Sequence, residues 1–130
     1  MLKTKMSPQG QTYDYELHDS LNNDVPDTWT LIAKTEIPSR DPGVYEVKLM
    51  FNYTFNSTNT SAFARFDING QTVATGEREP KDKSDVEVKD FFKIFEHQGG
   101  PVVMELYAMK ETADHTLNFG YADMALERKG

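Results

Sequence analysis

Three histidines are the residues best suited to metal binding or acid–base chemistry in this chain of 130 residues. They are His18, His97 and His115, and none has a second histidine at metal-ligand spacing. The chain contains no H-x-H or H-E-x-x-H pattern and no cysteine, which excludes thiolate metal sites and disulfides. We expect His97 and His115 to lie exposed in turns, and the sequence predicts neither a metal nor a cofactor.

Carboxylates are abundant, and many of them lie in the run 77–85. This run holds four acids and three bases: Glu77, Glu79, Asp82, Asp85, Arg78, Lys81 and Lys83. Such alternation is typical of a solvated loop, and the spacing of a calcium loop is absent. Composition alone leaves open an acid pair for glycoside hydrolysis. Since no G-x-S-x-G motif, phosphate-binding glycine loop or cysteine nucleophile occurs, we predict no catalytic residues and a protein that is not an enzyme.

Charge and length narrow the classes of partner. The net charge of −7 and a pI near 4.9 argue against nucleic acid or an anionic membrane as the main partner. No apolar run approaches the roughly 18 residues that a membrane helix needs, and none follows the basic residues near Met1 as a signal peptide would require. We expect one domain that is made in a cytoplasm.

Alternating apolar residues predict a series of strands. Between residues 45 and 55 every odd position is apolar, so one face of a long strand is expected in the core. A second strand over 61–68 leads to Asn69-Gly70, the strongest hairpin signal, which pairs Phe66 with Val73. Further strands are expected over 28–37, from 86 to 95, from 102 to 108 and over 116–127, where Gly120 allows a bulge.

About eight short strands without a helix indicate an all-β antiparallel sandwich. A jelly roll is favoured, and an immunoglobulin-like sandwich without the Cys–Trp–Cys arrangement remains the alternative. We predict a sandwich domain over residues 23–130, preceded by residues 1–22 as an N-terminal arm or short edge strand. Tyr13, Tyr15 and Leu17 carry the alternation of that short strand.

Aromatic residues are the informative surplus, with eight Phe, six Tyr and one Trp. Most of them fall on the side of a predicted strand that is expected to face the core. Some fall on the opposite side of their strand. If these point outward they mark a protein interface, and if the strand from 86 to 95 is covered on both sides they are core. The candidate interface residues are Phe63, Phe91, Phe95, Tyr13 and Tyr15.

From Trp29 to its end the chain resembles small virion-associated proteins of tailed bacteriophages. The resemblance covers about three-quarters of the sequence and rests on descriptive motifs. They are GVYEV at 43–47, FARFDING at 63–70, EPKDKSD at 79–85, FEHQGGP at 95–101, LYAMKE at 106–111 and LERK at 126–129. The resemblance implies a jelly-roll-like structural protein of the virion, often oligomeric, such as a capsid decoration or cement protein.

Three functions follow as expectations. The first is a decoration protein that clamps neighbouring subunits of the major capsid protein as a homo-oligomer, with a trimer favoured because it matches local threefold positions. The second is a tail, collar or fibre component that binds other virion proteins. The third is a carbohydrate-binding module that uses Trp29 and tyrosines, although a single Trp near a strand start is more often core.

Overall fold

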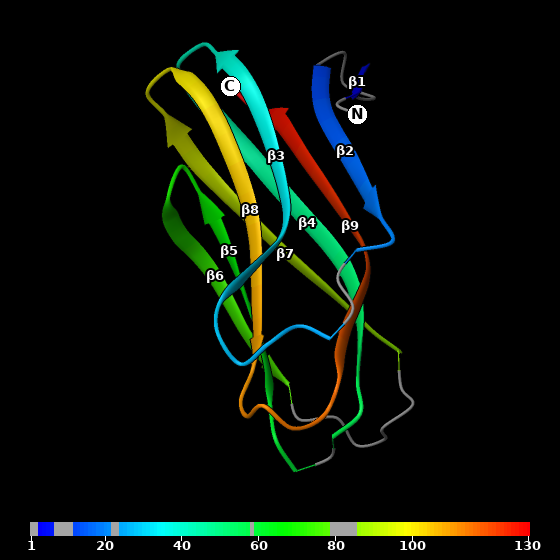
Figure 1. Cartoon of the computed structure of the whole chain (residues 1–130). Helices are drawn as coiled ribbons and strands as arrows, with labels where there is room; N and C mark the ends of the chain where they lie inside the picture. Colours follow the sequence, from blue (N-terminus) through cyan, green and yellow to red (C-terminus); the bar gives the residue numbers. More distant parts are fainter. Residues whose placement is uncertain (1–2, 7–11, 22–23, 58, 79–85) are drawn as a thin grey trace.

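A computed structural model of the chain describes residues 3–6, 12–21, 24–57, 59–78 and 86–130 (Figure 1). The described residues form nine strands and no helix. These are β1 (Lys3–Met6), β2 (Thr12–Asp19), β3 (Thr30–Arg40), β4 (Gly43–Phe55), β5 (Ala62–Ile68), β6 (Gln71–Arg78), β7 (Val86–His97), β8 (Gly100–Lys110) and β9 (Leu117–Arg128). The predicted all-β class is confirmed.

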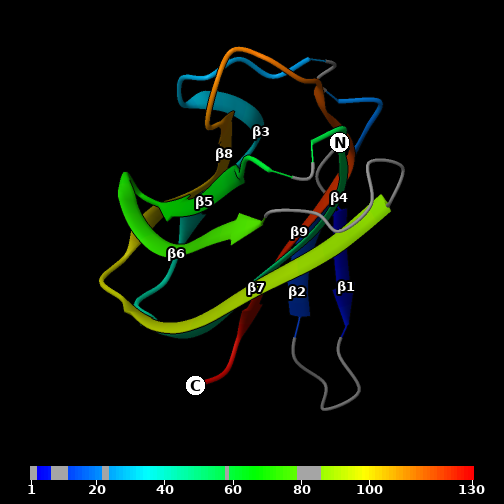
Figure 2. The same cartoon turned by 90° about the horizontal axis from the view of Figure 1, so that it is seen from below.

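The strands form two antiparallel sheets that face each other, as Figure 2 shows. One sheet has the order β1-β2-β9-β4-β7, and the other has the order β3-β8-β5-β6. Without β1, each sheet contains four strands, and successive strands alternate between the sheets except at the β5–β6 hairpin. This is the strand order of a jelly roll, so the predicted sandwich and its favoured topology are confirmed.

The predicted arm is partly a strand of this sandwich. β2 pairs with β9 over seven residues, from Tyr13 opposite Glu127 to Asp19 opposite Tyr121. β1 adds to the other side of β2 and forms that edge of the sheet. A boundary at residue 22 therefore does not separate β2 from the domain, because backbone pairing joins β2 to the last strand.

The core lies between the sheets and comes from one parity of each strand. The odd positions of β4 from Tyr45 to Phe55 are all buried, as the alternation predicts. β8 contributes Val102, Met104, Leu106 and Ala108, all of them fully buried. Residues of opposite parity on these strands line the outer faces. The period-two pattern therefore identifies the inner face of both strands.

The Asn69-Gly70 turn is confirmed, with positive φ angles of 50° and 81° at its two residues. Its predicted register is wrong by one residue, because Phe66 lies opposite Ala74 instead of Val73. A bulge between Phe66 and Asp67 inserts the extra residue, and both Val73 and Ala74 pack against the core.

Gly120 forms the predicted bulge in β9. Phe119 lies opposite Tyr53 and Ala122 opposite Phe51, so Gly120 and Tyr121 share one position. The parity shifts at this point, and Tyr121 joins the outer face instead of the side that Phe119 occupies. The side chain of Asn52 closes the bulge, because its Oδ1 accepts a hydrogen bond from the Tyr121 backbone at 2.9 Å.

We expect Gly120→Ala to lower the free energy of unfolding by about 1–3 kcal/mol. A Cβ at Gly120 would lie 2.5 Å from Oδ1 of Asn52, so the side chain that closes the bulge must move. Urea denaturation measures the loss. In the double variant Gly120→Ala/Asn52→Ala the clash is absent, so its loss should be smaller than the sum of the single losses. Simple additivity would contradict this explanation.

Candidate interaction surfaces

The predicted interface residues separate onto different faces. Tyr15 lies on the outer face of the five-stranded sheet, half-buried, and Phe63 lies half-buried on the outer face of the other sheet. Phe91 is only 9% exposed and points into the core, and Phe95 packs partly buried against it. An outward orientation is therefore wrong for Phe91 and Phe95. The backbone register places Tyr13 opposite Glu127, and its side chain lies outside the described ones.

Phe91 faces inward, and its ring packs against Phe51 in the core and against Gly76 of the opposite sheet. Its centroid lies 5.6 Å from that of Phe51, edge to face. The ring also packs over Gly76 of β6, where a Cβ would come within 3.2 Å of it. The inner parity of β7 is therefore Lys89, Phe91, Lys93, Phe95 and His97, with both lysines exposed. No described element covers the other side of β7, so the alternative that this strand is covered on both sides is also wrong.

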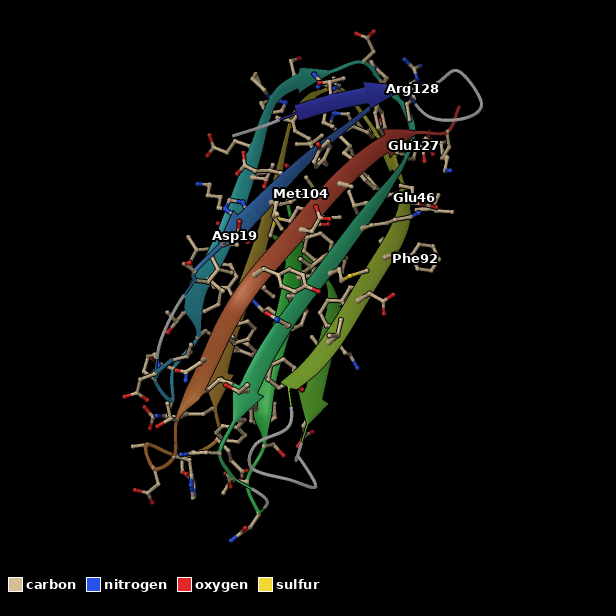
Figure 3. All side chains as sticks on the ribbon, turned by 90° about the vertical axis from the view of Figure 1, so that its right-hand side faces the viewer. Asp19, Glu46, Phe92, Met104, Glu127 and Arg128 are labelled. Atoms are coloured by element: carbon tan, nitrogen blue, oxygen red, sulfur yellow. The ribbon has the colours of Figure 1, made fainter. Side chains whose placement is uncertain are left out.

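The outer face of the five-stranded sheet carries an exposed apolar surface, which we call the outer apolar patch. It contains most of the large exposed hydrophobic side chains among the described residues. The members are Leu17, Val44, Met50, Val88, Phe92 and Ile94. Figure 3 shows the ring of Phe92 standing clear of β7, and this residue is 65% exposed. Exposed apolar groups that cluster on one face are typical of a protein-binding surface.

Strand register places these residues in rows across the sheet. One row runs from Tyr15 through Ala125 and Lys48 to Phe92, and crosses β2, β9, β4 and β7. In the neighbouring row, Asp123 of β9 lies between Leu17 and Met50. The patch is therefore one surface shared by four strands, with charged residues between its apolar members.

Among the described side chains of this face, acidic residues outnumber basic ones. Glu46 and Glu127 lie directly opposite each other on β4 and β9, at the same end of the sheet in Figure 3. Lys48 binds Glu46 at 3.2 Å and Lys129 binds Glu127 at 3.0 Å, which offsets the repulsion between the two carboxylates. Asp19, Asp90 and Glu96 share the face, as the strand register shows, and have no ion pair with a described residue. The surface is both apolar and acidic.

Asp123 is the unusual acid of this face. Its Oδ1 is shielded from solvent and has no hydrogen-bond partner among the described residues. Burial raises the pKa of the Asp123 carboxyl above its ordinary value of 3.8. A carboxylate in this position, between Leu17 and Met50, is suited to accept a hydrogen bond from a partner that covers the face.

We expect Asp123→Asn to raise the free energy of unfolding at pH 7 by about 0.5 kcal/mol, since solvent still reaches part of the carboxyl. Because folding raises this pKa, the charged form destabilises the native state at neutral pH. The advantage of the variant should shrink as the pH falls through the raised pKa and vanish below 3.8. Urea denaturation at several pH values measures it, with Asp90→Asn as the control for a lost charge. An advantage that grows towards acid pH would contradict this assignment.

The outer face of the four-stranded sheet carries a stack of three side chains, which we call the Trp29–Arg65–Tyr107 stack. The Cζ atom of Arg65 lies 4.8 Å from the ring centroid of Trp29 and 4.3 Å from that of Tyr107. Trp29 is 42% exposed, so its expected core position is wrong. Burial raises the pKa of the Tyr107 phenol, and its hydrogen bond to Glu105 at 3.1 Å adds to the shift.

The histidines occupy three different environments. His97 is buried and its Nε2 lies 2.9 Å from the carbonyl oxygen of Gly100, so its expected exposure is wrong. His115 is exposed, as expected. Nε2 of His18 lies 2.8 Å from Glu16 and 3.1 Å from the Thr35 hydroxyl. Among the described residues no group of three or more His, Asp or Glu is placed to hold a metal ion.

A cavity of about 220 Å³ opens between the edge strands β6 and β7. Its walls include the rings of Phe51, Phe91 and Phe119, with Glu77 and Lys89 beside them. The nearby charged run lies mostly outside the described residues. Its described part, Glu77 and Arg78, belongs to β6 and not to the predicted loop. None of the described residues forms a helix long and apolar enough to cross a membrane.

Comparison with known proteins shows what this fold is similar to. The sequence matches no protein-family profile. No curated protein matches it either. The structure is similar to that of infectious bursal disease virus, Gx strain, with a TM-score of 0.61 and 8% identity over 91% of this chain and 33% of the viral chain. For the VP2 subviral particle of infectious bursal disease virus, the TM-score is 0.58 and the identity 9%, over 89% of this chain and 33% of that chain.

A third solved structure matches along nearly its whole length. Eiger TNF from S. frugiperda has a TM-score of 0.57 and 10% identity, over 91% of this chain and 92% of that chain. This chain spans about a third of the two viral chains. At such identities the likeness concerns the fold alone. The chain is thus a jelly-roll β-sandwich of the kind that also occurs in proteins of a virus particle.

Proposed function

We propose that this chain is a structural protein of a tailed-bacteriophage particle that decorates the capsid and binds neighbouring subunits of the major capsid protein. The outer apolar patch carries this proposal, because exposed residues such as Phe92 and Ile94 lie on one face of a rigid sheet. Such a face gains free energy when a partner covers it. The role is binding without catalysis, in a virion assembled in the host cytoplasm.

Two further observations support this role. The jelly roll is shared with the VP2 protein of a subviral particle, and the sequence motifs resemble those of small phage virion proteins. The acidic residues around the patch favour a partner surface that is basic as well as apolar. A homo-oligomer, with a trimer favoured, would repeat each contact and so gain by multivalency.

Mass spectrometry of purified phage particles whose genome encodes this chain tests the proposal. We expect the chain in the particle in many copies and, after removal, to co-sediment again with capsids that lack it. Native mass spectrometry of the purified protein should show an oligomer. Absence from the particle would overturn the proposal, and binding to isolated tails but not to capsids would replace it with a tail, collar or fibre component.

A further inference from the structure

The Trp29–Arg65–Tyr107 stack has the features of a binding site on the face opposite the outer apolar patch. The Arg65 guanidinium lies over both rings, so it covers part of one face of the Trp29 indole. Since Trp29 is still 42% exposed, much of the remaining indole surface is open to solvent. Large exposed aromatic surface is unfavourable in water unless a ligand covers it.

Contacts within β5 and β8, and one from β6, hold Arg65 and Tyr107 in place. Nε of Arg65 lies 3.3 Å from the carboxylate of Asp67, which is buried. The hydroxyl of Thr72 donates to the same carboxylate at 2.8 Å, and the Tyr107 hydroxyl donates to Glu105. Arg65 and Tyr107 are therefore held in a fixed orientation on which the Trp29 ring rests, which reduces the entropy lost when a ligand binds.

Hydrogen-bonding groups lie beside the Arg65 side of the stack. The two terminal nitrogen atoms of Arg65 donate to none of the residues that the structure describes. Thr75, the cross-strand partner of Arg65 on β6, is exposed. Lys34 on β3 is exposed as well, and its ammonium group lies 2.9 Å from Glu36. A flat apolar ring beside polar groups matches a sugar, whose ring presents C–H groups on its face and hydroxyl groups at its edge.

We propose that this face binds a neutral oligosaccharide, with one sugar ring stacked on the open face of Trp29 and hydroxyl groups directed to the polar residues beside the stack. The site is independent of the proposed role in the virion, because it lies on the other sheet. The decoration protein would then attach by one face and bind a glycan with the other.

Charge and size favour a neutral sugar over other ligands. Trp29 and Leu31 are the large exposed apolar residues of this face among those described, which is little area for a stable protein interface. The chain carries a net charge of −7, and Asp67 already neutralises Arg65. A nucleic acid or an acidic polysaccharide would therefore be repelled, whereas an uncharged ring would not.

The site contains its own reporter, since Trp29 is the single tryptophan of the chain. Fluorescence of the full chain is titrated with cellohexaose, chitohexaose and mannohexaose, with hexagalacturonate as the acidic probe. We expect a saturable change with at least one neutral hexaose, with a Kd on the order of 1 mM or tighter, and none with hexagalacturonate. No change with any neutral probe, or saturation by the acidic probe alone, would overturn the proposal.

Variants on the two faces locate the site. Calorimetric titration should show binding at least about tenfold weaker for Trp29→Ala, because one stacked ring is lost. Arg65→Lys should weaken it by about threefold or more, since an ammonium group does not replace the planar guanidinium. Phe92→Ala, an exposed aromatic on the opposite sheet, is the matched control and should bind sugar within about twofold of the parent.

Particle binding separates this inference from the proposed function. Trp29→Ala should co-sediment with capsids as the parent chain does. Thermal melts should confirm that Trp29→Ala and Arg65→Lys are folded. If Trp29→Ala loses capsid binding while no hexaose binds the parent, the stack is a protein contact and the glycan proposal fails. If capsid binding is absent from the parent but a hexaose binds it, the glycan site stands alone.

Discussion

Phe51→Ala will lower the free energy of unfolding by about 3–5 kcal/mol, which is a large part of the stability of a domain of this size. Phe51 is 1% exposed and its ring centroid lies 5.6 Å from those of Phe91 and Phe119. It therefore joins β4 to both neighbouring strands. The side chain also lines the cavity of about 220 Å³, so its removal enlarges a space that is already open.

Urea denaturation followed by far-UV circular dichroism measures this effect. Phe92→Ala is the matched control, because it removes the same atoms from a neighbouring strand where the ring is 65% exposed. We expect the control to change stability by less than about 0.5 kcal/mol. A loss below about 1 kcal/mol for Phe51→Ala would mean that the two sheets close over the space left by the ring. The contacts among Phe51, Phe91 and Phe119 would then contribute little to the stability of the domain.

The double variant Phe92→Ser/Ile94→Ser will lose capsid binding by roughly 100-fold. Both side chains are more than half exposed on the outer apolar patch, so their contribution arises when a partner covers the sheet. Two contacts of more than 1 kcal/mol each account for a change of this size. Co-sedimentation of labelled protein with capsids that lack it gives the apparent Kd.

Leu31→Ser is the control for this experiment, since Leu31 is exposed on the opposite sheet. It should bind capsids as the parent does, and all variants should keep the melting temperature within a few degrees. Equal losses for Leu31→Ser and the double variant would show that the binding is not specific to one face. Unchanged binding of the double variant would assign attachment to another surface.

Much of the fold follows from the sequence because the central strands have one apolar parity. The inner positions of β4 from 45 to 55 and of β8 from 102 to 108 are all apolar. Asn69-Gly70 defines a turn that only residues tolerant of positive φ accept. Local pattern and tertiary structure agree in these elements. The bulge at Gly120 can also be predicted from the sequence, because the apolar residues change from odd to even positions at this glycine.

β7 shows where such a pattern is insufficient. Both of its parities are apolar, with Phe91 and Phe95 on one side and Val88, Phe92 and Ile94 on the other. Periodicity cannot select between them, and the open backbone of Gly76 on another sheet admits Phe91. This contact joins strands of two different sheets, so periodicity within β7 alone does not reveal it.

The polar interior of β2 and the stack at Trp29 were not predictable for a similar reason. Asp14 is buried because Arg40 of β3 binds its carboxylate. The ring of His18 on β2 lies within hydrogen-bonding distance of the Thr35 hydroxyl, which is also on β3. Trp29 is held outside the core by Arg65, which follows it by 36 positions. The pattern of one sequence carries no information about pairs of residues that are distant along the chain. The sequence could therefore suggest that aromatic residues form an interface, but not which face of the sandwich carries it.

β7 is also an edge strand, and its inner parity contains Lys89 and Lys93 on either side of Phe91. An edge strand of 12 residues would otherwise offer its backbone groups to the sheet of another molecule, the first step of fibrous aggregation. If a second chain extended the sheet here, the two ammonium groups would be trapped between layers without water. The lysines thus oppose open-ended strand addition at this edge.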